Sequence, residues 1–148
     1  RPNVACMLYK KEDSGYKILL VKRKDIYENW QLPQGGTEGE GLEKAGAREL
    51  REELGTDKFK TIASFKNMHR YEFGKMIKTQ IKRYSGFKGQ KQGLFIAEFL
   101  GDNDDIKIKF WDLEDWKWVD SERLLEEIHF VRRESTKVFL EKFKEVIK

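Results

Sequence analysis

Short apolar runs, each bounded by turn residues, predict most of the β-strands of this chain. Residues 4–9, with the sequence VACMLY, predict a buried strand, and residues 17–21, KILLV, predict the strand that returns beside it. The polar residues 11–15 between these runs end in glycine and predict the turn of a hairpin. Further strands are predicted at residues 59–65, 76–84, 94–100 and 116–119.

Residues 42–54 predict a helix. Leu50 and Leu54 are four residues apart, so they fall on one face that can pack against a core. Gly55 follows directly, and a glycine at this position is a common helix stop signal.

A second amphipathic helix is predicted at residues 133–147, and a short helix is predicted after Asp120 or Ser121, either of which is a favourable N-cap. Loops or turns are predicted at residues 30–41, 66–75, 85–92 and 101–105. Mixed strands flanked by helices on both faces predict the α/β class, arranged as an α/β/α sandwich.

The first predicted helix carries three carboxylates at positions i, i+3 and i+4, namely Glu49, Glu52 and Glu53. On a helix these positions share one face, and like charges there repel each other by about 0.2–0.5 kcal/mol per exposed pair. A cation among them removes that repulsion, and hard oxygen ligands suit Mg²⁺ or Mn²⁺. Arginine and glutamate at these spacings also form solvated ion pairs. The helix alone therefore leaves a metal site and a solvated surface as alternatives.

Residues close to the triplet favour the metal site. Ala45 and Gly46 lie one turn earlier and are expected to leave room above the carboxylates for phosphates. The preceding loop adds Glu38 and Glu40, acids without evident partners. Its glycines allow close backbone approach to a ligand. They are residues 35, 36, 39 and 41.

With this spacing the chain resembles the Nudix hydrolase family, whose box is Gly, five residues, Glu, seven residues, Arg-Glu-apolar-any-Glu-Glu-any-Gly-apolar. Two positions differ from the box. Gln34 occupies the position of its opening glycine, so that Gly35 follows one residue later, and Thr56 occupies its final apolar position. The resemblance implies a Nudix-type α/β/α sandwich with a central mixed sheet. It also implies Mg²⁺ as cofactor, with Mn²⁺ as an alternative, held by the three carboxylates and by Gly35 of the loop. The matching residues are Glu40, Arg48, Glu49, Leu50, Glu52, Glu53 and Gly55.

Four further strings resemble one subgroup of that family, the RNA pyrophosphohydrolases and dinucleoside polyphosphate hydrolases. They are RPNV at residues 1–4, WQLPQGG at 30–36, GQKQ at 89–92 and WKWV at 116–119. The resemblance implies a substrate that is a capped or triphosphorylated nucleotide end.

The resemblance also implies roles for residues of the helix. Glu52 and Glu53 are expected to be catalytic, because metal ions held there would neutralise phosphate charge and lower the pKa of an attacking water. Arg48 is expected to pair with Glu40, a structural contact that orients the ligand helix.

One further catalytic acid is expected outside the helix. The resembling subgroup places it four residues before Trp116, where this chain has Asp112. Glu114, two residues later, is the alternative, and an ordinary acidic loop is the functionally neutral interpretation of both.

In the resembling RNA enzymes an arginine and a phenylalanine hold a base between them, and here the corresponding residues are Arg23 and Phe130. Such stacking contributes about 1–3 kcal/mol per base without base preference. Core packing between two helices is the alternative for Phe130. Val131 stands where the subgroup usually has lysine, which leaves Arg132 as the substitute. Residues predicted to hold the distal phosphates are Arg1, Tyr84, Lys91 and Gln92, with Lys88 as a further candidate.

The remaining aromatic and reactive residues are expected to be structural. The tryptophans at 30, 111, 116 and 118 are predicted to be core residues, and His69 and His129 to be surface or packing residues. Cys6, the only cysteine, lies in an apolar strand and is expected to be a buried residue in a reducing cytoplasm.

Length and composition predict one enzyme domain over residues 1–148, since 39% of the residues are hydrophobic and 13% are aromatic. No apolar run approaches the roughly 20 residues that span a bilayer, so no membrane partner is expected. A monomer without an obligate protein partner is expected.

The net charge of +4 hides a strong segregation of charge. Residues 75–91 carry six lysines and arginines and no acid, whereas acids collect in 38–53 and 102–115. This distribution suits an acidic metal site ringed by phosphate-binding groups. Solubility is the alternative explanation for the lysines.

The resemblance, together with the carboxylate triplet and the basic residues, predicts a metal-dependent pyrophosphohydrolase that removes pyrophosphate from the 5′-triphosphate end of RNA. A hydrolase of dinucleoside polyphosphates such as diadenosine tetraphosphate is the alternative, because the same site can serve both substrates. A non-catalytic Nudix nucleotide sensor is disfavoured because the box glutamates are all present, and a basic RNA-binding module would leave the carboxylate triplet unexplained.

Overall fold

The computed structural model describes residues 2–24, 29–72 and 89–147, so the strand predicted at residues 76–84 lies outside the described residues. In chain order the elements are β1 (Pro2–Glu12), β2 (Gly15–Arg23), β3 (Trp30–Gln31), β4 (Gln34–Gly36), α1 (Leu42–Leu54), β5 (Phe59–Glu72), β6 (Gly89–Phe99), η3 (Asn103–Asp105), β7 (Leu113–Asp120), η4 (Ser121–Arg123), α3 (Leu124–Glu127), η5 (Phe130–Arg132) and α4 (Arg133–Val146).

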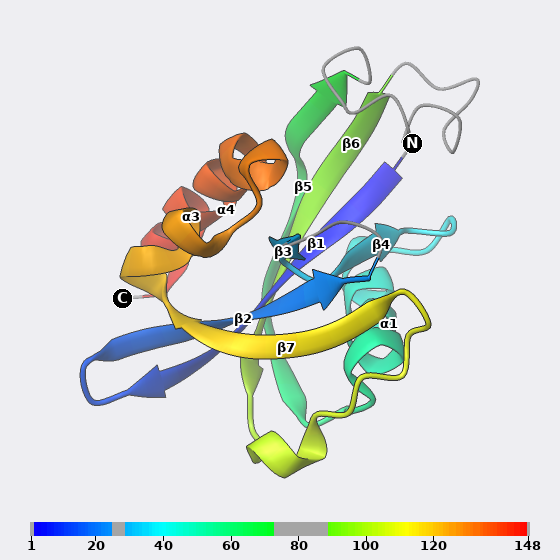
Figure 1. The fold of residues 1–148 in the computed structure, drawn as a ribbon. Helices are drawn as coiled ribbons and strands as arrows, with labels where there is room; N and C mark the ends of the chain where they lie inside the picture. The colour runs from blue at the N-terminus through cyan, green and yellow to red at the C-terminus, as the bar shows by residue number, and fades with distance from the viewer. Residues whose placement is uncertain (1, 25–28, 73–88, 148) are drawn as a thin grey trace.

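The described strands form one mixed sheet in the order β3-β2-β1-β6-β5, with β4 also on β1 and β7 also on β2 (Figure 1). The central pair, β1 and β6, is parallel. The other pairings are antiparallel, including the predicted hairpin of β1 and β2. The mixed sheet is therefore confirmed.

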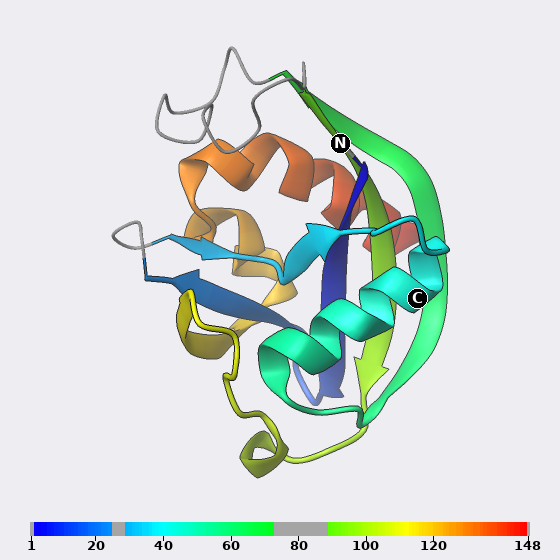
Figure 2. The same cartoon turned by 90° about the vertical axis from the view of Figure 1, so that its right-hand side faces the viewer.

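Helices cover both faces of this sheet, α1 on one and α3 with α4 on the other (Figure 2). Alternate residues of β1 supply the two cores, as the period of two in a strand requires. Val4, Cys6 and Leu8 pack in the cluster beneath α1. Ala5 and Met7 pack in the cluster beneath α4. The predicted α/β/α sandwich is confirmed.

Helix α1 has the predicted bounds and the predicted stop. Gly55 has a φ of 66°, and its N–H donates to the carbonyl of Arg51. A left-handed residue here favours glycine because it has no Cβ. The helix therefore begins and ends where the sequence predicts, and this fixes the positions of the three box glutamates on it.

Residues 30–36, predicted as loop, contain two short strands. β3 pairs with β2, and β4 pairs with β1 so that Gly35 lies opposite Val4. The prediction was wrong because Gly35 and Gly36 have no side chains. Their strand comes from backbone pairing, which leaves no hydrophobic alternation to detect.

The β5–β6 pair is longer than predicted. β5 continues to Glu72, through residues 66–72 of the predicted connector, and β6 begins at Gly89 within the predicted loop. A register shift between Phe65 and His69 marks an irregularity of the β-bulge type, with Asn67 at a φ of 54°. A bulge interrupts the period-two pattern, and β5 lies at the end of the strand order, where polar residues are common.

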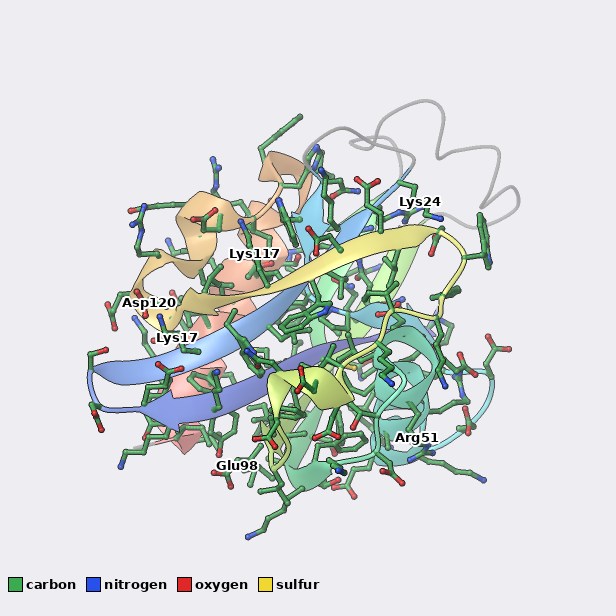
Figure 3. The ribbon with its side chains drawn as sticks, turned by 60° about the horizontal axis from the view of Figure 1, so that its bottom comes forward. Lys17, Lys24, Arg51, Glu98, Lys117 and Asp120 are labelled. Atoms are coloured by element: carbon green, nitrogen blue, oxygen red, sulfur yellow. The ribbon has the colours of Figure 1, made fainter. Side chains whose placement is uncertain are left out.

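The chain around β7 shows two smaller differences. The strand starts at Leu113, three residues earlier than predicted. Asp120 precedes η4, but its side chain makes no capping hydrogen bond there. Its carboxylate lies 2.7 Å from Nζ of Lys17 on β2 instead (Figure 3), so Asp120 occupies one of the two predicted N-cap positions without making the capping hydrogen bond. The cross-strand ion pair is the competing interaction.

Candidate active site

A cavity of about 560 Å³ opens beside the N-terminal ends of β1 and β4, between α1, the end of β2 and the loop before β7. Its lining is mostly polar and charged. Six acids contribute, namely Glu38, Glu40, Glu49, Glu52, Glu53 and Asp112. Three arginines contribute as well, namely Arg23, Arg48 and Arg132. The structure therefore brings all the predicted acidic site residues to one place.

Packing of α1 against the sheet directs its carboxylates into the cavity. Leu50 and Leu54 are fully buried. A Cβ added to Gly46 would meet the ring of Phe95 at 2.4 Å, so glycine lets the helix approach β6 closely. Ala45 is also buried in this core. The expectation that Ala45 and Gly46 leave room for phosphates was wrong, because they face the sheet.

Arg48 lies beside Glu40, as the family resemblance implies. Its Nε donates to Oε1 of Glu40 at 2.6 Å, and one terminal nitrogen donates to the Gly36 carbonyl at 2.8 Å. The other donates to Glu49 at 2.8 Å and to Glu52 at 3.3 Å. One guanidinium thus connects the glycine loop to two carboxylates of α1.

Burial makes two of these carboxylates difficult to ionise. Glu49 and Glu53 are each 5% exposed. Burial raises the pKa of Glu53 well above its usual value, and the charges of Glu49 and Asp112 raise it further. Burial also raises the pKa of Glu49, against the lowering effect of Arg48. Buried carboxylates are stable as anions only beside compensating cations or donors.

The donor set fits a hard divalent cation. Oε2 of Glu53 is buried without a hydrogen-bond partner among the residues that the structure describes. A Cβ on Gly35 would meet the Glu49 carboxyl carbon at 2.2 Å, so glycine lets the loop backbone lie directly against this carboxylate. Among the described residues, no group of three or more His, Cys, Asp or Glu side chains is already arranged to hold a metal ion. Arg48 contacts one carboxylate oxygen of Glu49 and one of Glu52.

Asp112 and Glu114 lie in different surroundings. Asp112 lines the cavity, and its Oδ2 is 3.6 Å from a guanidinium nitrogen of Arg23. Glu114 pairs with Lys22 at 3.2 Å and is not part of the cavity wall. Of the two candidates, the geometry favours Asp112.

Gln92 lies behind the cavity wall and is only 1% exposed. Its Nε2 donates to Oδ1 of Asn3 and to Oε1 of Gln34, both at 2.8 Å. The carbonyl oxygens of Asn3 and Gln34 therefore face Gln92, and their NH₂ groups turn away from it. Asn3 and Gln34 line the cavity, where such groups can donate to phosphate oxygens.

Asn3 and Gln34 were missed as site residues, together with Gln31 and Phe110 of the cavity wall. The strings RPNV and WQLPQGG contained three of them and were the available signal. No local pattern marked Phe110.

The two residues of the predicted base-stacking pair differ in exposure. Arg23 is buried in the cavity wall beside Asp112. Phe130 is 68% exposed and stacks at 4.7 Å on His129, which excludes the core alternative for Phe130. Burial lowers the pKa of His129, and the charge of Arg132 lowers it further. Arg132 itself lines the cavity.

The four tryptophans differ in how far they are buried. Trp30, Trp116 and Trp118 pack against the two cores, as predicted. Trp111 is 75% exposed, so its assignment to the core was wrong. It belongs to the loop before β7, and its neighbours in sequence reach the cavity instead.

The remaining phosphate-binding candidates are only partly described. Arg1, Tyr84 and Lys88 lie outside the described residues. Lys91 is exposed on β6, paired in the sheet with Pro2. It lines a separate, smaller cavity that shares Asn3 and Glu40 with the acidic one.

The protein-family model of the NUDIX domain matches residues 1–139 of the sequence. The chain belongs to the Nudix family. A curated Nudix relative from Wolbachia pipientis subsp. Culex pipiens (strain wPip), an RNA pyrophosphohydrolase, is 36% identical over 100% of this chain and 91% of its own length. A second from Wolbachia sp. subsp. Brugia malayi (strain TRS), with the same name, is 37% identical over 100% of this chain and 92% of its own length.

Among solved structures, a C. elegans Ap4A hydrolase in a binary complex has a TM-score of 0.68 with this Nudix chain. The two share 17% sequence identity over 97% of this chain and 98% of the other. That likeness supports the fold. The prediction of a Nudix hydrolase is confirmed, and Nudix hydrolases generally need divalent metal ions. Within the described ranges, every helix is too short or too polar to cross a lipid bilayer.

Proposed function

We propose that this Nudix hydrolase removes pyrophosphate from the 5′-triphosphate end of RNA. The observation that carries the proposal is one cavity in which the glutamates of α1 face Arg23 and Arg132. Carboxylates suit a divalent cation, and guanidinium groups suit phosphate oxygens. The two RNA pyrophosphohydrolases that match the whole chain support RNA as the substrate.

In the proposed reaction a water molecule attacks the α-phosphorus of the triphosphate, and the bond between that phosphorus and the oxygen bridging it to the β-phosphorus breaks. The products are RNA with a 5′-monophosphate and pyrophosphate. Glu49, Glu52 and Glu53, with the backbone of Gly35, would hold Mg²⁺, for which Mn²⁺ is the alternative. A bound ion supplies charge neutralisation and lowers the pKa of the attacking water.

The residues of the chain position the reactants. Arg132 and the NH₂ groups of Asn3 and Gln34 bind phosphate oxygens from the cavity wall. Asp112, on the loop that faces α1, takes the proton of the attacking water, and Arg23 holds its carboxylate in place. Arg48 aligns Glu49 and Glu52 without touching the substrate. Phe130, which is exposed, stacks on a base of the RNA end.

We propose that the protein acts in the cytoplasm and as a monomer. No second copy is required to complete the cavity, because one chain supplies the acids and the arginines described above.

The test offers triphosphorylated RNA and diadenosine tetraphosphate at equal concentrations to the purified protein with Mg²⁺, and resolves the products chromatographically. We expect RNA monophosphate and pyrophosphate to form faster than mononucleotide products, and chelation of the metal to stop both. If diadenosine tetraphosphate were cleaved faster than the RNA, it would be assigned as the substrate in place of RNA. Binding of either compound without cleavage would overturn the proposal in favour of a nucleotide sensor.

A further inference from the structure

Trp111 exposes a large apolar face at the rim of the cavity. The described residues contain three strongly exposed large hydrophobic side chains, which are Leu100, Trp111 and Phe130. Trp111 directly precedes Asp112 and follows Phe110, both of which line the cavity. Leaving an indole ring in water forgoes the favourable burial that most tryptophans obtain.

The loop that carries Trp111 is anchored at both ends. The N–H of Lys107 donates to the carbonyl of Leu54 at the end of α1, at 2.8 Å. The N–H of Lys24 donates to the carbonyl of Asp112, also at 2.8 Å, and Figure 3 shows Lys24 beside the loop that enters β7. The ring centroid of Phe110 lies 6.0 Å from that of Trp111 at an interplanar angle of 62°. The loop therefore presents the indole outward on an ordered support.

Lysines lie on this rim, within a stretch of the chain (residues 102–115) that also carries acids, among them Asp112 directly after Trp111. Residues 106–111 read IKIKFW, with exposed lysines and no acid. The side chain of Lys109 lies across Gly55 at the C-terminal end of α1, where a cation is favourable in any case. Lys107 lies at the same helix end, since its N–H donates to the carbonyl of Leu54, whereas Lys24 is exposed beside Asp112 without that explanation. An aromatic face among lysines is the combination that binds single-stranded nucleic acid.

We propose that Trp111 stacks on a base of the RNA chain that follows the 5′-terminal nucleotide, and so forms a second base-binding site separate from Phe130. This inference rests on the proposed RNA substrate. Base stacking on an aromatic side chain changes affinity by about 5- to 150-fold. Trp111 is a binding residue for the chain beyond the triphosphate, while the chemistry takes place at Asp112 and α1.

The kinetic test compares Trp111→Ala with the wild type on a short 5′-triphosphorylated RNA. We expect the KM to rise by about 5- to 150-fold with kcat within about twofold. Trp111→Phe should recover most of the loss, because it retains an aromatic face. Leu100→Ala is the matched control, since it removes another exposed apolar side chain and should change neither constant. A fall in kcat at unchanged KM would overturn the proposal, because the residue would then act through Asp112.

A binding test separates this proposal from the proposed function. Titration with 5′-monophosphorylated RNA should quench the tryptophan fluorescence of the wild type more than that of Trp111→Phe, since the other three tryptophans are at least partly buried. Quenching without cleavage of triphosphorylated RNA would support the stacking site and refute the proposed reaction. Cleavage with equal quenching in both proteins would refute the stacking site alone. A change of oligomeric state in Trp111→Ala, seen by sedimentation with RNA affinity unchanged, would assign Trp111 to a contact between copies and overturn the proposal.

Discussion

Glu49 and Glu53 are buried, whereas the side chain of Glu52 between them is 51% exposed. The helical register that puts all three on one side of α1 therefore gives them unequal environments. Glu53 has the strongest need for a counter-charge, because burial and two neighbouring acids oppose its ionisation. A divalent cation at this position would stabilise the ionised form.

We predict that Glu52→Gln and Glu53→Gln each lower kcat by at least about a hundredfold, because each removes one anionic metal ligand while keeping volume. The metal-free melting temperature of Glu53→Gln should equal or exceed that of the wild type, since a neutral amide avoids the cost of burying charge. Glu43→Gln, on the exposed side of the same helix, is the control for both measurements. Near-normal turnover by both variants would refute the metal site.

Asp112→Asn should lower kcat with KM nearly unchanged, because it keeps shape but removes charge and basicity. Asp112→Glu should retain activity. Steady-state kinetics on triphosphorylated RNA measure both effects. Glu114→Gln is the matched control, because Glu114 pairs with Lys22 away from the cavity. If Glu114→Gln were the damaging change, the assignment of Asp112 would be wrong.

Between elements, the contact of α1 with β6 decides where the glutamates lie. Gly46 is the point of closest approach, since the Phe95 ring occupies the space that a side chain would need. The thiol of Cys6 on β1 donates to the carbonyl of this glycine at 3.6 Å, so three elements meet there. Burial raises the pKa of that thiol, and the charges of Glu53 and Glu49 raise it further, which indicates how close the core lies to the acidic cavity.

Gly46→Ala should destabilise the protein by about 1–3 kcal/mol, because the added methyl group overpacks the contact with Phe95. It should also lower kcat by displacing Glu49 and Glu53. Gly41→Ala is the matched control, since a Cβ at Gly41 meets nothing within 4 Å and its φ of −62° suits alanine. Chemical denaturation and kinetics measure the two effects. Equal stability of both variants would show that the helix does not rest on this contact.

Mg²⁺ should stabilise the protein more as pH rises. The pKa values of Glu49 and Glu53 are higher in the folded chain than their usual value, so the folded state holds these protons more tightly. That contribution is fully present below the unfolded pKa of about 4.3 and is lost as pH rises through the folded values. Melting without metal should therefore show this loss, and Mg²⁺ should offset it by binding the ionised groups.

The measurement is the Mg²⁺-induced rise in melting temperature at about pH 5 and about pH 8, which bracket the usual range of perturbed carboxyls. We expect a larger rise at the higher pH, and a smaller difference in Glu53→Gln. The same rise at both values would contradict linkage between metal binding and these carboxyls.

Across the protein, charge is divided between an acidic cavity and basic surfaces near it. Lys24, Lys91 and Lys107 are exposed on different segments that approach the cavity region. The basic residues 75–88 of the sequence lie outside the described residues. Such a distribution attracts a phosphate chain over its length while metal ions neutralise the centre. A single domain over residues 1–148 and a monomeric state stay predictions.

The kcat/KM for triphosphorylated RNA should fall as salt concentration rises, and its log–log slope should be steeper than that for a mononucleoside triphosphate, because more phosphates are contacted. Lys24→Gln should make the slope for RNA shallower. Lys142→Gln, on α4 and paired with Glu145, is the control and should leave it unchanged. Equal slopes for the long and short substrates would argue against RNA contacts beyond the terminal nucleotide.

Local spacing was sufficient to predict α1, its glycine stop and the β1–β2 hairpin, while the family resemblance implied the pairing of Arg48 with Glu40. These features depend on residues within a few turns of one another, so hydrophobic period and short-range charge pairing encode them. The box spacing likewise identified the acidic face of α1 before its surroundings were known.

Contacts between distant segments determined the rest. Backbone pairing with β1 made a strand of the glycine-rich residues 34–36. Packing of the loop before β7 placed Asp112 in the cavity and Trp111 in solvent, although the two are adjacent in sequence. Gln92 and Asn3, 89 residues apart, met across the sheet. Burial and long-range hydrogen bonding depend on which segments pack together. The hydrophobic pattern within one segment does not indicate its packing partners.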